Sequence, residues 1–367
     1  MRSSPAEAHR TWIRRHFTET GGILASATYQ PYQRVWLRDH ALVAQALLRW
    51  NFWPEVEQAA AFSARILQAE APRMERAIQH SPQDPHALDE ALHPRARYWP
   101  DGSWVQEPWA ERQYDGVALN LWFLAEVAQR TGRWPVPLEV VEITARYLLH
   151  FWPTPCAGPW EMYETAVHTW TLGAVYRALN AVVPVVPKAR QAAQQIRGFL
   201  EAHLTPQGLP RKMILHGQPV GWDASSLMLF LDFQVWPAQR AAPLLPLLDA
   251  WLSPDGIQLR RFVIPELGIR DTYFGGGAWV IPSVWAARIA LHQGNPERAQ
   301  RLLALLPPPS DPLPEQWPET AWDPAGRFWW HWKSLRENRG SPGPARPLAW
   351  SHAAVLNLLK DLEDHSS

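Results

Sequence analysis

Two glutamates, Glu161 and Glu315, stand beside tryptophan in short segments with the composition of loops, GPWEMYE and LPEQW. Hydrolysis of a glycosidic bond generally uses one carboxylic acid that protonates the leaving oxygen and one carboxylate that activates water. Indole rings offer apolar faces on which a sugar ring can lie. The residue types therefore indicate an acid and a base that act on a carbohydrate.

Three further segments combine charged and aromatic residues: YQRVWLRD at 32–39, RDTYFGGGAW at 270–279 and PLAWSH at 347–352. Arg38 beside Asp39 suits a pair of neighbouring hydroxyls, because the guanidinium donates and the carboxylate accepts hydrogen bonds. A structural ion pair at a helix start is the alternative. The glycines after Arg270 allow close backbone approach, but they also fit a tight turn that enters a helix.

The charge balance and cysteine content exclude several classes of partner. The 367 residues include 35 basic and 35 acidic ones, so no electrostatic surface for nucleic acid or an anionic membrane is expected. The single cysteine, Cys156, can form neither an internal disulfide nor a cysteine zinc site. We expect a small neutral oligosaccharide as the partner, no cofactor and no metal. The N-terminus lacks the apolar run of a signal peptide, which predicts a cytoplasmic protein.

Apolar residues recur at helical spacing in about twelve segments that turn residues separate. The expected helices span 5–19, 38–50, 54–70, 114–131, 137–151, 164–182, 186–204, 223–232, 241–252, 277–292, 295–306 and 351–364. Segments that are apolar nearly all round alternate with amphipathic ones, as inner and outer helices would. The pattern predicts an all-α fold, an (α/α)6 barrel of six helical hairpins in one domain, 1–367. Strand-like stretches are short, such as 257–264.

Four long segments, 71–113, 205–222, 253–276 and 307–350, are expected to be irregular loops on the active-site rim. Asp39, Asp115 and Asp223 each fall near the start of an expected inner helix. Such aspartates often cap helices, which accounts for them without any ligand. Because inner helices that start on one rim converge on one cavity, capping and sugar binding are compatible.

The order of these motifs, from about Gly22 to Leu359, resembles glycoside hydrolase family 15, which contains glucoamylases, glucodextranases and bacterial trehalases. The resemblance implies that Glu161 in the Trp-Glu motif is the general acid and that Glu315 in LPEQ is the general base. The segments that carry it also include RQYDG at 112–116 and PLAWSHA at 347–353. The substrate-binding residues that it implies are Trp36, Arg38, Asp39, Asp115, Trp160, Arg270, Tyr273, Trp317 and Trp350.

A general acid must hold its proton when substrate binds, and burial of Glu161 among Trp160, Met162 and Tyr163 would raise its pKa. Glu164, one helical turn away, is the rival for this role, although a favourable charge at a helix start explains it. Met162 stands where glucoamylases typically have a second acidic residue. This difference from glucoamylases falls on the part of the pocket that would bind the leaving group, and it therefore affects which substrate is expected.

The resemblance implies an inverting, exo-acting enzyme that releases β-glucose from the non-reducing end of short α-glucosides. Malto-oligosaccharides, isomalto-oligosaccharides and trehalose are the candidates, since the sequence has neither a recognisable N-terminal β-sandwich nor a starch-binding module. The alternative is a barrel that binds carbohydrate for regulation and has lost turnover. A phosphorylase would need a basic phosphate site near Glu315, which the sequence does not indicate. The size suggests a monomer or a weak homodimer.

Overall fold

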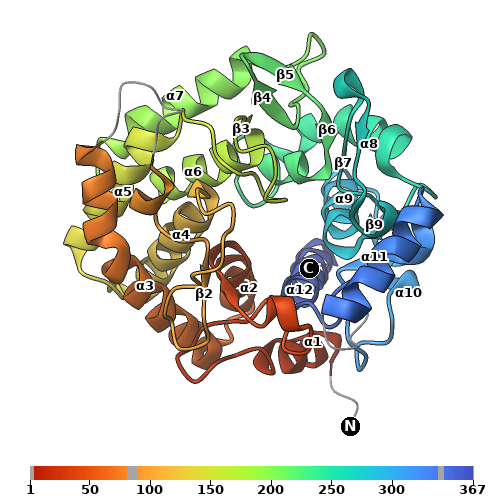
Figure 1. The fold of residues 1–367 in the computed structure, drawn as a ribbon, viewed down its shortest axis with the longest axis horizontal. Helices are drawn as coiled ribbons and strands as arrows, with labels where there is room; N and C mark the ends of the chain where they lie inside the picture. The colour runs from red at the N-terminus through yellow and green to blue at the C-terminus, as the bar shows by residue number, and fades with distance from the viewer. Residues whose placement is uncertain (1–3, 81–88, 338–342, 367) are drawn as a thin grey trace.

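Helices arranged in two concentric rings form the protein, in a computed structural model that describes residues 4–80, 89–337 and 343–366 (Figure 1). The inner ring consists of α2 (Leu37–Arg49), α4 (Tyr114–Thr131), α6 (Thr169–Val182), the 3-10 helix η4 (Ala224–Leu229), α9 (Val280–His292) and α12 (Ala349–Ser366). The outer ring consists of α1 (Pro5–Arg14), α3 (Trp53–Gln79), α5 (Leu138–Phe151), α7 (Ala189–Ala202), α8 (Leu244–Leu252) and α10 (Glu297–Leu305).

The inner ring is closed. Each of its helices packs against the next, in the order α2, α4, α6, η4, α9, α12, and α12 returns to α2. The first helix, α1, also packs on the last, α12, so the two ends of the chain meet in one wall of the ring. The predicted (α/α)6 barrel is confirmed.

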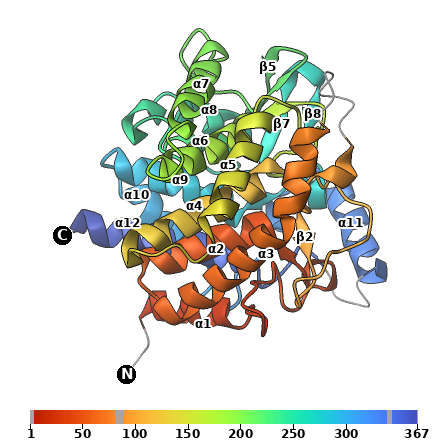
Figure 2. The same ribbon diagram turned by 90° about the vertical axis from the view of Figure 1, so that its left-hand side faces the viewer.

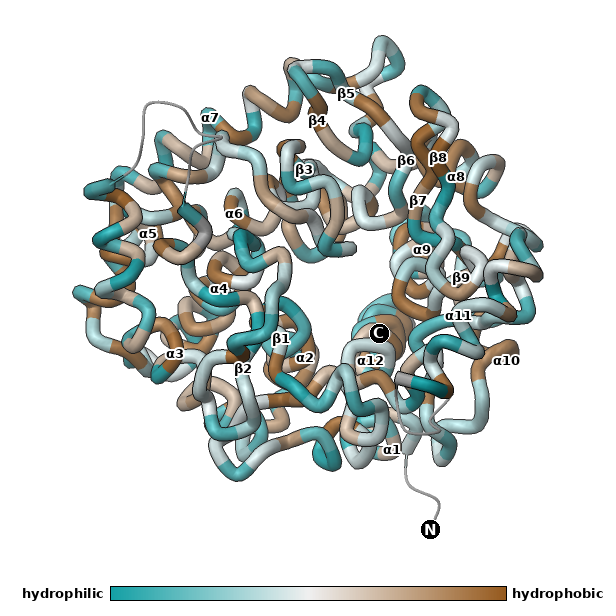
Figure 3. Tube along the Cα trace, viewed as in Figure 1, coloured by the Kyte–Doolittle hydropathy of each residue, from teal (hydrophilic) through white to brown (hydrophobic). Residues whose placement is uncertain are grey.

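Hydrophobic patterning sorts the helices between the two rings. Helix α9 is apolar nearly all round and is buried from Val280 to Leu291, as an inner helix must be. Helix α7 buries one stripe of residues and leaves the opposite face to solvent; the stripe is Ala189, Ala192, Ala193, Ile196 and Leu200. Figure 3 shows the matching alternation of hydrophilic and hydrophobic residues along the outer helix α5.

Short antiparallel strands gather at the end of the barrel where the inner helices begin. They are β1 (Val35–Trp36), β2 (Arg97–Tyr98), β3 (Val167–His168), β4 (Met213–Leu215), β5 (Gln218–Val220), β6 (Trp222–Asp223), β7 (Phe262–Ile264), β8 (Ile269–Arg270), β9 (Ala278–Trp279) and β10 (Gln316–Trp317). Strands β1, β3, β6 and β9 each run directly into an inner helix. Figure 2 shows β2, β7 and β8 toward one end of the barrel and the C-terminus at the other.

Three expectations for the elements need correction. Helix α3 continues through Pro72 to Gln79, beyond the expected end at 70. The fourth inner helix is a short 3-10 helix instead of an α-helix. An additional helix, α11 (Pro324–Glu337), occupies part of the expected loop 307–350. The pattern did not indicate α11, because Phe328, Trp329 and Trp332 are exposed and define no buried stripe.

Short 3-10 helices and turns complete the connections between the larger elements. These are η1 (Gln30–Tyr32), η3 (Glu90–Leu92), η5 (Ala238–Ala241), η6 (Pro265–Leu267), η7 (Tyr273–Gly275) and η8 (Pro318–Thr320). The expected loop 205–222 contains the hairpin β4–β5, and residues 81–88 of the expected loop 71–113 lie outside the described residues. In the described part of the chain, no helix has the length and apolar character needed to cross a membrane.

Candidate active site

A pocket opens at the end of the barrel where the inner helices begin. It is lined by Ala25, Tyr32, Trp36, Arg38, Asp39, Pro159, Trp160, Arg261, Trp279, Ile281, Glu315, Leu348 and Trp350. These residues come from segments far apart in the sequence, which the strands and helix starts bring to one rim. The pocket is therefore a product of the closed barrel.

Glu161 lies at the edge of this pocket, in a turn where its φ of 59° is unusual for a residue other than glycine. Its Oε1 accepts hydrogen bonds from Trp36 Nε1 at 2.8 Å, Gln113 Nε2 at 3.1 Å and Arg38 at 3.2 Å. The side chain is 18% exposed. Because the hydrogen bonds among the described residues converge on Oε1, Oε2 is the oxygen placed to exchange a proton with a ligand.

The surroundings of Glu161 differ from those expected from the sequence. Met162 is exposed and does not bury the carboxyl group. Polar donors from Trp36, Arg38 and Gln113 surround it instead of an apolar shell. Neither Glu161 nor Glu164 is among the residues that line the pocket, but Glu161 accepts hydrogen bonds from two residues that do, Trp36 and Arg38. Glu164 lies ahead of α6, which begins only at Thr169. The geometry therefore favours Glu161 over Glu164 as the carboxyl that meets a ligand.

Asp115 supports the pocket from behind. It is fully buried, and its Oδ2 accepts hydrogen bonds from Arg38 at 3.0 Å and from Trp170 Nε1 at 2.8 Å. The carboxylate fixes the guanidinium of Arg38, which reaches forward to Glu161. Asp115 therefore holds Arg38 in position without lining the pocket, whereas Asp39 is one of the lining residues. Burial is the main cause that raises the pKa of Asp39 to about 7.

Glu315 is 3% exposed and stands directly before β10, whose Gln316 pairs with Trp279 of β9. Its backbone is held on both sides, by Ala345 and by Val280. The carboxylate accepts a hydrogen bond from the hydroxyl of Tyr32 at 3.0 Å and from that of Tyr273 at 3.3 Å. Burial raises the pKa of Glu315 to about 7, and the charge of Arg261 and the Tyr32 hydrogen bond oppose the rise.

The arginine that the structure brings to the pocket is Arg261, not Arg270. Arg270 is exposed and lies over the ring of Trp322 at 5.3 Å. Arg261 lines the pocket, and Asp271 accepts two hydrogen bonds from it at 2.6 and 2.7 Å. A β-hairpin separates Arg261 from Asp271 in the sequence, so adjacency in the chain suggested Arg270, which does not line the pocket. A basic residue directly before the buried strand β7 was the available signal.

The aromatic wall consists of Trp36, Trp160, Trp279 and Trp350, of which Trp279 was not expected. Trp160 is fixed by Asp223, whose carboxylate accepts from its Nε1 at 2.8 Å. Asp223 also caps η4, as expected, but it is not among the residues that line the pocket. Trp317 is buried in β10 and does not line the pocket. Tyr273 does not line the pocket, but its hydroxyl bonds to Glu315 and to Tyr32, both of which do.

Residues 7–193, just over half of the chain, match the family described as glycosyl hydrolases family 15. The chain belongs to this family. Family 15 members hydrolyse glycosidic bonds, and the chain is a glycosidase. Among the described residues, no group of three or more His, Cys, Asp or Glu side chains is arranged to hold a metal ion.

Similar proteins cover almost the whole of this family 15 chain. An isomaltose glucohydrolase of Kribbella flavida is 27% identical over 95% of this chain and 90% of its own length. A glycosidase solved in complex with glucose is 25% identical, with a TM-score of 0.83 over 98% of this chain and 96% of that one. The glucoamylase of Saccharomycopsis fibuligera, 14% identical over 99% of this chain and 95% of its own, shares the fold with a TM-score of 0.67.

Proposed function

We propose that this family 15 glycosidase removes single glucose units from the non-reducing end of short α-glucosides, with isomaltose-type linkages preferred, by an inverting mechanism. The observation that carries the proposal is that Glu315 lines the tryptophan-walled pocket while Glu161 accepts hydrogen bonds from Trp36 and Arg38 of the same pocket wall. The linkage preference follows the similarity to a protein named isomaltose glucohydrolase.

In this proposal the non-reducing glucose lies between the tryptophan faces, and charged groups bind its hydroxyls. Arg38 and Asp39 come from the start of α2, and Arg261 comes from the opposite wall. Guanidinium groups donate and the carboxylate accepts, so neighbouring hydroxyls can be held in fixed geometry. Asp115 and Asp271 keep the two guanidinium groups in place from behind.

The reaction is a single displacement with one acid and one base. Glu161 donates the proton on Oε2 to the glycosidic oxygen, so that the leaving sugar departs as a neutral alcohol. Glu315 accepts a proton from a water molecule, whose oxygen bonds to the anomeric carbon as the bond to the leaving oxygen breaks. The attack comes from the face opposite the leaving group, which inverts the configuration. Glu315 ends protonated and Glu161 ionised, and proton exchange with solvent restores both.

Exo action is proposed from the position of the pocket at one end of the closed ring, where Leu348 and Trp350 at the start of α12 are among its lining residues. Outside the lining, Trp109 is 40% exposed, and the centroid of its ring lies 6.2 Å from that of the lining residue Trp36. We assign its exposed face to the leaving part of the substrate. The closed ring, with α1 packed on α12, supports the proposal that one catalytic domain spans the chain.

The test is glucose release from isomaltose, panose, maltose, trehalose and soluble starch by the wild type, Glu161→Gln and Glu315→Gln. We expect the highest kcat/KM on isomaltose or panose and a loss of at least about 1,000-fold in both variants, a magnitude typical for removal of a catalytic group. Release of oligosaccharides from within a chain would contradict exo action. Full activity in Glu161→Gln would contradict the assigned acid.

A further inference from the structure

The barrel has a second cavity at the opposite end, where the inner helices finish. Its volume is about 670 Å³, within the range of about 300–1,000 Å³ that is usual for small-molecule sites. Residues of four inner helices line it, among them Arg49 on α2, Trp122 on α4, Trp285 and Arg288 on α9, and Asn357 and Asp361 on α12. Trp350 lines this cavity and also the active-site pocket, so it separates the two cavities.

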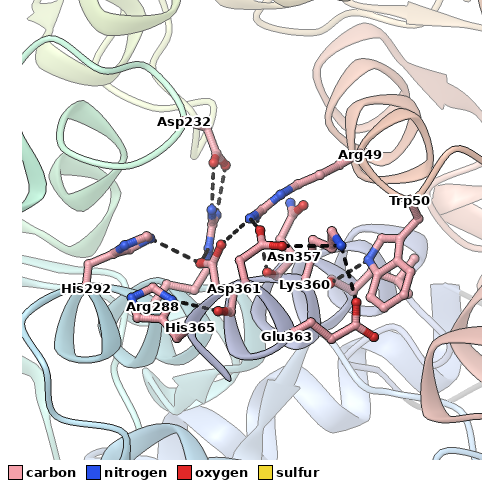
Figure 4. Close-up of polar contacts among 12 residues, drawn as sticks. Arg49, Trp50, Asp232, Arg288, His292, Asn357, Lys360, Asp361, Glu363 and His365 are labelled. Atoms are coloured by element: carbon pink, nitrogen blue, oxygen red, sulfur yellow. Dashed lines mark hydrogen bonds and ion pairs between the residues drawn. The ribbon is translucent and has the colours of Figure 1, made fainter. Parts of the chain in front are cut away.

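A charged cluster at this end reproduces the layered arrangement of the active site. Asp361 is 1% exposed and accepts a hydrogen bond from Arg288, which is 4% exposed. Arg288 also donates two hydrogen bonds, of 2.7 and 2.9 Å, to Asp232, whose side chain is 22% exposed. Figure 4 shows Arg288 between these two carboxylates, with Arg49 also on Asp361.

The active site has the same sequence of layers. There the fully buried Asp115 fixes the buried Arg38, which reaches the partly exposed Glu161. In both places a buried carboxylate and a buried guanidinium hold a more exposed carboxylate at a cavity wall. The exposed member therefore has its orientation fixed before any ligand arrives.

The charges that line the far cavity are largely matched within the protein. Arg177 pairs with Glu126 at 2.9 Å, and the indole of Trp122 donates to the same carboxylate. Arg130 is the exception, since its hydrogen-bond partners are neutral: the backbone carbonyl of Leu48 and the side-chain oxygen of Asn51 accept from it. Paired ions leave little net field for an ionic ligand, but they retain donors and acceptors that can bind hydroxyl groups. Tryptophan faces beside them suit the apolar face of a sugar ring.

We propose that this cavity is a second carbohydrate site, which binds an uncharged sugar of one or two rings between the tryptophans and the cluster around Asp232 and Arg288. The site takes part in no bond cleavage, because the two glutamates assigned to catalysis lie beyond Trp350. The proposal concerns binding alone, so it holds or fails independently of the proposed reaction.

The test uses glucose as the probe and follows the rise in Tm that binding to the native state produces. Asp39→Ala weakens binding in the active site, and we expect a glucose-dependent rise in Tm to persist in it. Adding Asn357→Trp, which fills the far cavity from α12, should abolish the remaining rise. Gln194→Trp on the exposed face of α7 is the matched control and should leave it unchanged.

Asp232→Asn keeps the volume of the cavity and removes the charge of the exposed acceptor. It should weaken glucose binding about tenfold, as expected for the loss of one good hydrogen bond. Hydrolytic activity of Asn357→Trp in the otherwise wild-type chain shows that this variant folds. A rise in Tm that both far-cavity variants leave intact would overturn the proposal. Binding of inorganic phosphate in place of glucose, lost in Asn357→Trp, would overturn the assigned ligand class.

Discussion

At the scale of single residues, the two glutamates have different surroundings, as their proposed roles of acid and base require. Glu161 is partly exposed, and its hydrogen bonds to Trp36, Arg38 and Gln113 converge on one oxygen. Glu315 is buried and receives a tyrosine hydroxyl on each oxygen. An acid needs an accessible oxygen that carries a proton, whereas a base needs an ionised group held toward water. The contacts match this division.

The ionisation of Glu315 predicts how kcat/KM falls at low pH. A base must be ionised, and burial raises the pKa of Glu315 to about 7, so kcat/KM should fall as the pH drops below about 7. Tyr32→Phe removes a hydrogen bond that stabilises the ionised form, and the fall should move to higher pH. Tyr147→Phe, which removes a buried hydroxyl bonded to His93, is the control and should leave the profile in place. An unmoved profile in Tyr32→Phe would contradict the account.

Two arginines close in sequence should differ sharply in their effect. Arg261→Lys loses the paired hydrogen bonds to Asp271 and misplaces the charge in the pocket, so kcat/KM should fall by about 10- to 100-fold. Arg270→Lys changes an exposed residue outside the pocket and should alter kcat/KM less than about twofold. Steady-state kinetics on isomaltose would decide. A larger loss of kcat/KM in Arg270→Lys than in Arg261→Lys would indicate that Arg270 binds the substrate.

At the scale of elements, pairs of short strands set the positions that the helices alone leave open. Strand β9 leads into α9, and its partner β10 directly follows Glu315. The two strands approach closely at Gly277, where an added Cβ would meet the carbonyl oxygen of Trp317 at 2.5 Å. Glu315, the proposed base, is therefore held in place by a backbone contact that only glycine permits.

This contact predicts that Gly277→Ala displaces β10 and Glu315, with a loss of kcat larger than any change in KM and a stability cost of about 1–3 kcal/mol. Gly198→Ala is the matched control. A Cβ there meets nothing within 4 Å on the exposed face of α7, so the variant should gain about 0.5–1 kcal/mol. Kinetics and thermal unfolding of both variants check the prediction. Wild-type kinetics in Gly277→Ala would show that β10 does not position the base.

Periodicity and motif order predicted the barrel, and the fold is confirmed. The roles of Glu161 and Glu315 remain predictions that the geometry supports. The sequence did not indicate that Arg261 and Trp279 line the pocket, because strand pairing, not proximity in sequence, brings them there. The sequence did not predict helix α11 either, because its aromatic residues are exposed and form no buried apolar stripe. Local patterns report which face of a helix is buried, but they do not report contacts that form only when the ring closes.

At the scale of the whole molecule, the barrel gathers buried carboxyl groups at one end, and this lowers stability. The pKa of Glu315 is about 7 in the folded protein against an ordinary value of 4.5. The folded chain therefore holds this proton more tightly than the unfolded chain. The resulting loss of stability is absent below about pH 4.5, grows as the pH rises, and is complete above about pH 7.

Glu315→Gln should therefore raise the free energy of unfolding at pH 8 while it removes activity. The expected gain is up to roughly 3 kcal/mol at pH 8 and near zero at pH 4.5, at about 1.4 kcal/mol for each pKa unit. Asp39→Asn should show the same trend, since burial also raises the pKa of Asp39 to about 7. Urea unfolding at the two pH values measures the difference. Equal gains at both would mean that the carboxyl charge is not the cause.

Glu161 and Glu315 are proposed to act as acid and base in a single inverting displacement. The most direct measurement follows the anomeric form of the first glucose released from isomaltose by NMR, before mutarotation, with Glu161→Gln and Glu315→Gln alongside. We predict initial β-glucose from the wild type and none from either variant. Initial α-glucose, or undiminished release by either variant, would contradict the account.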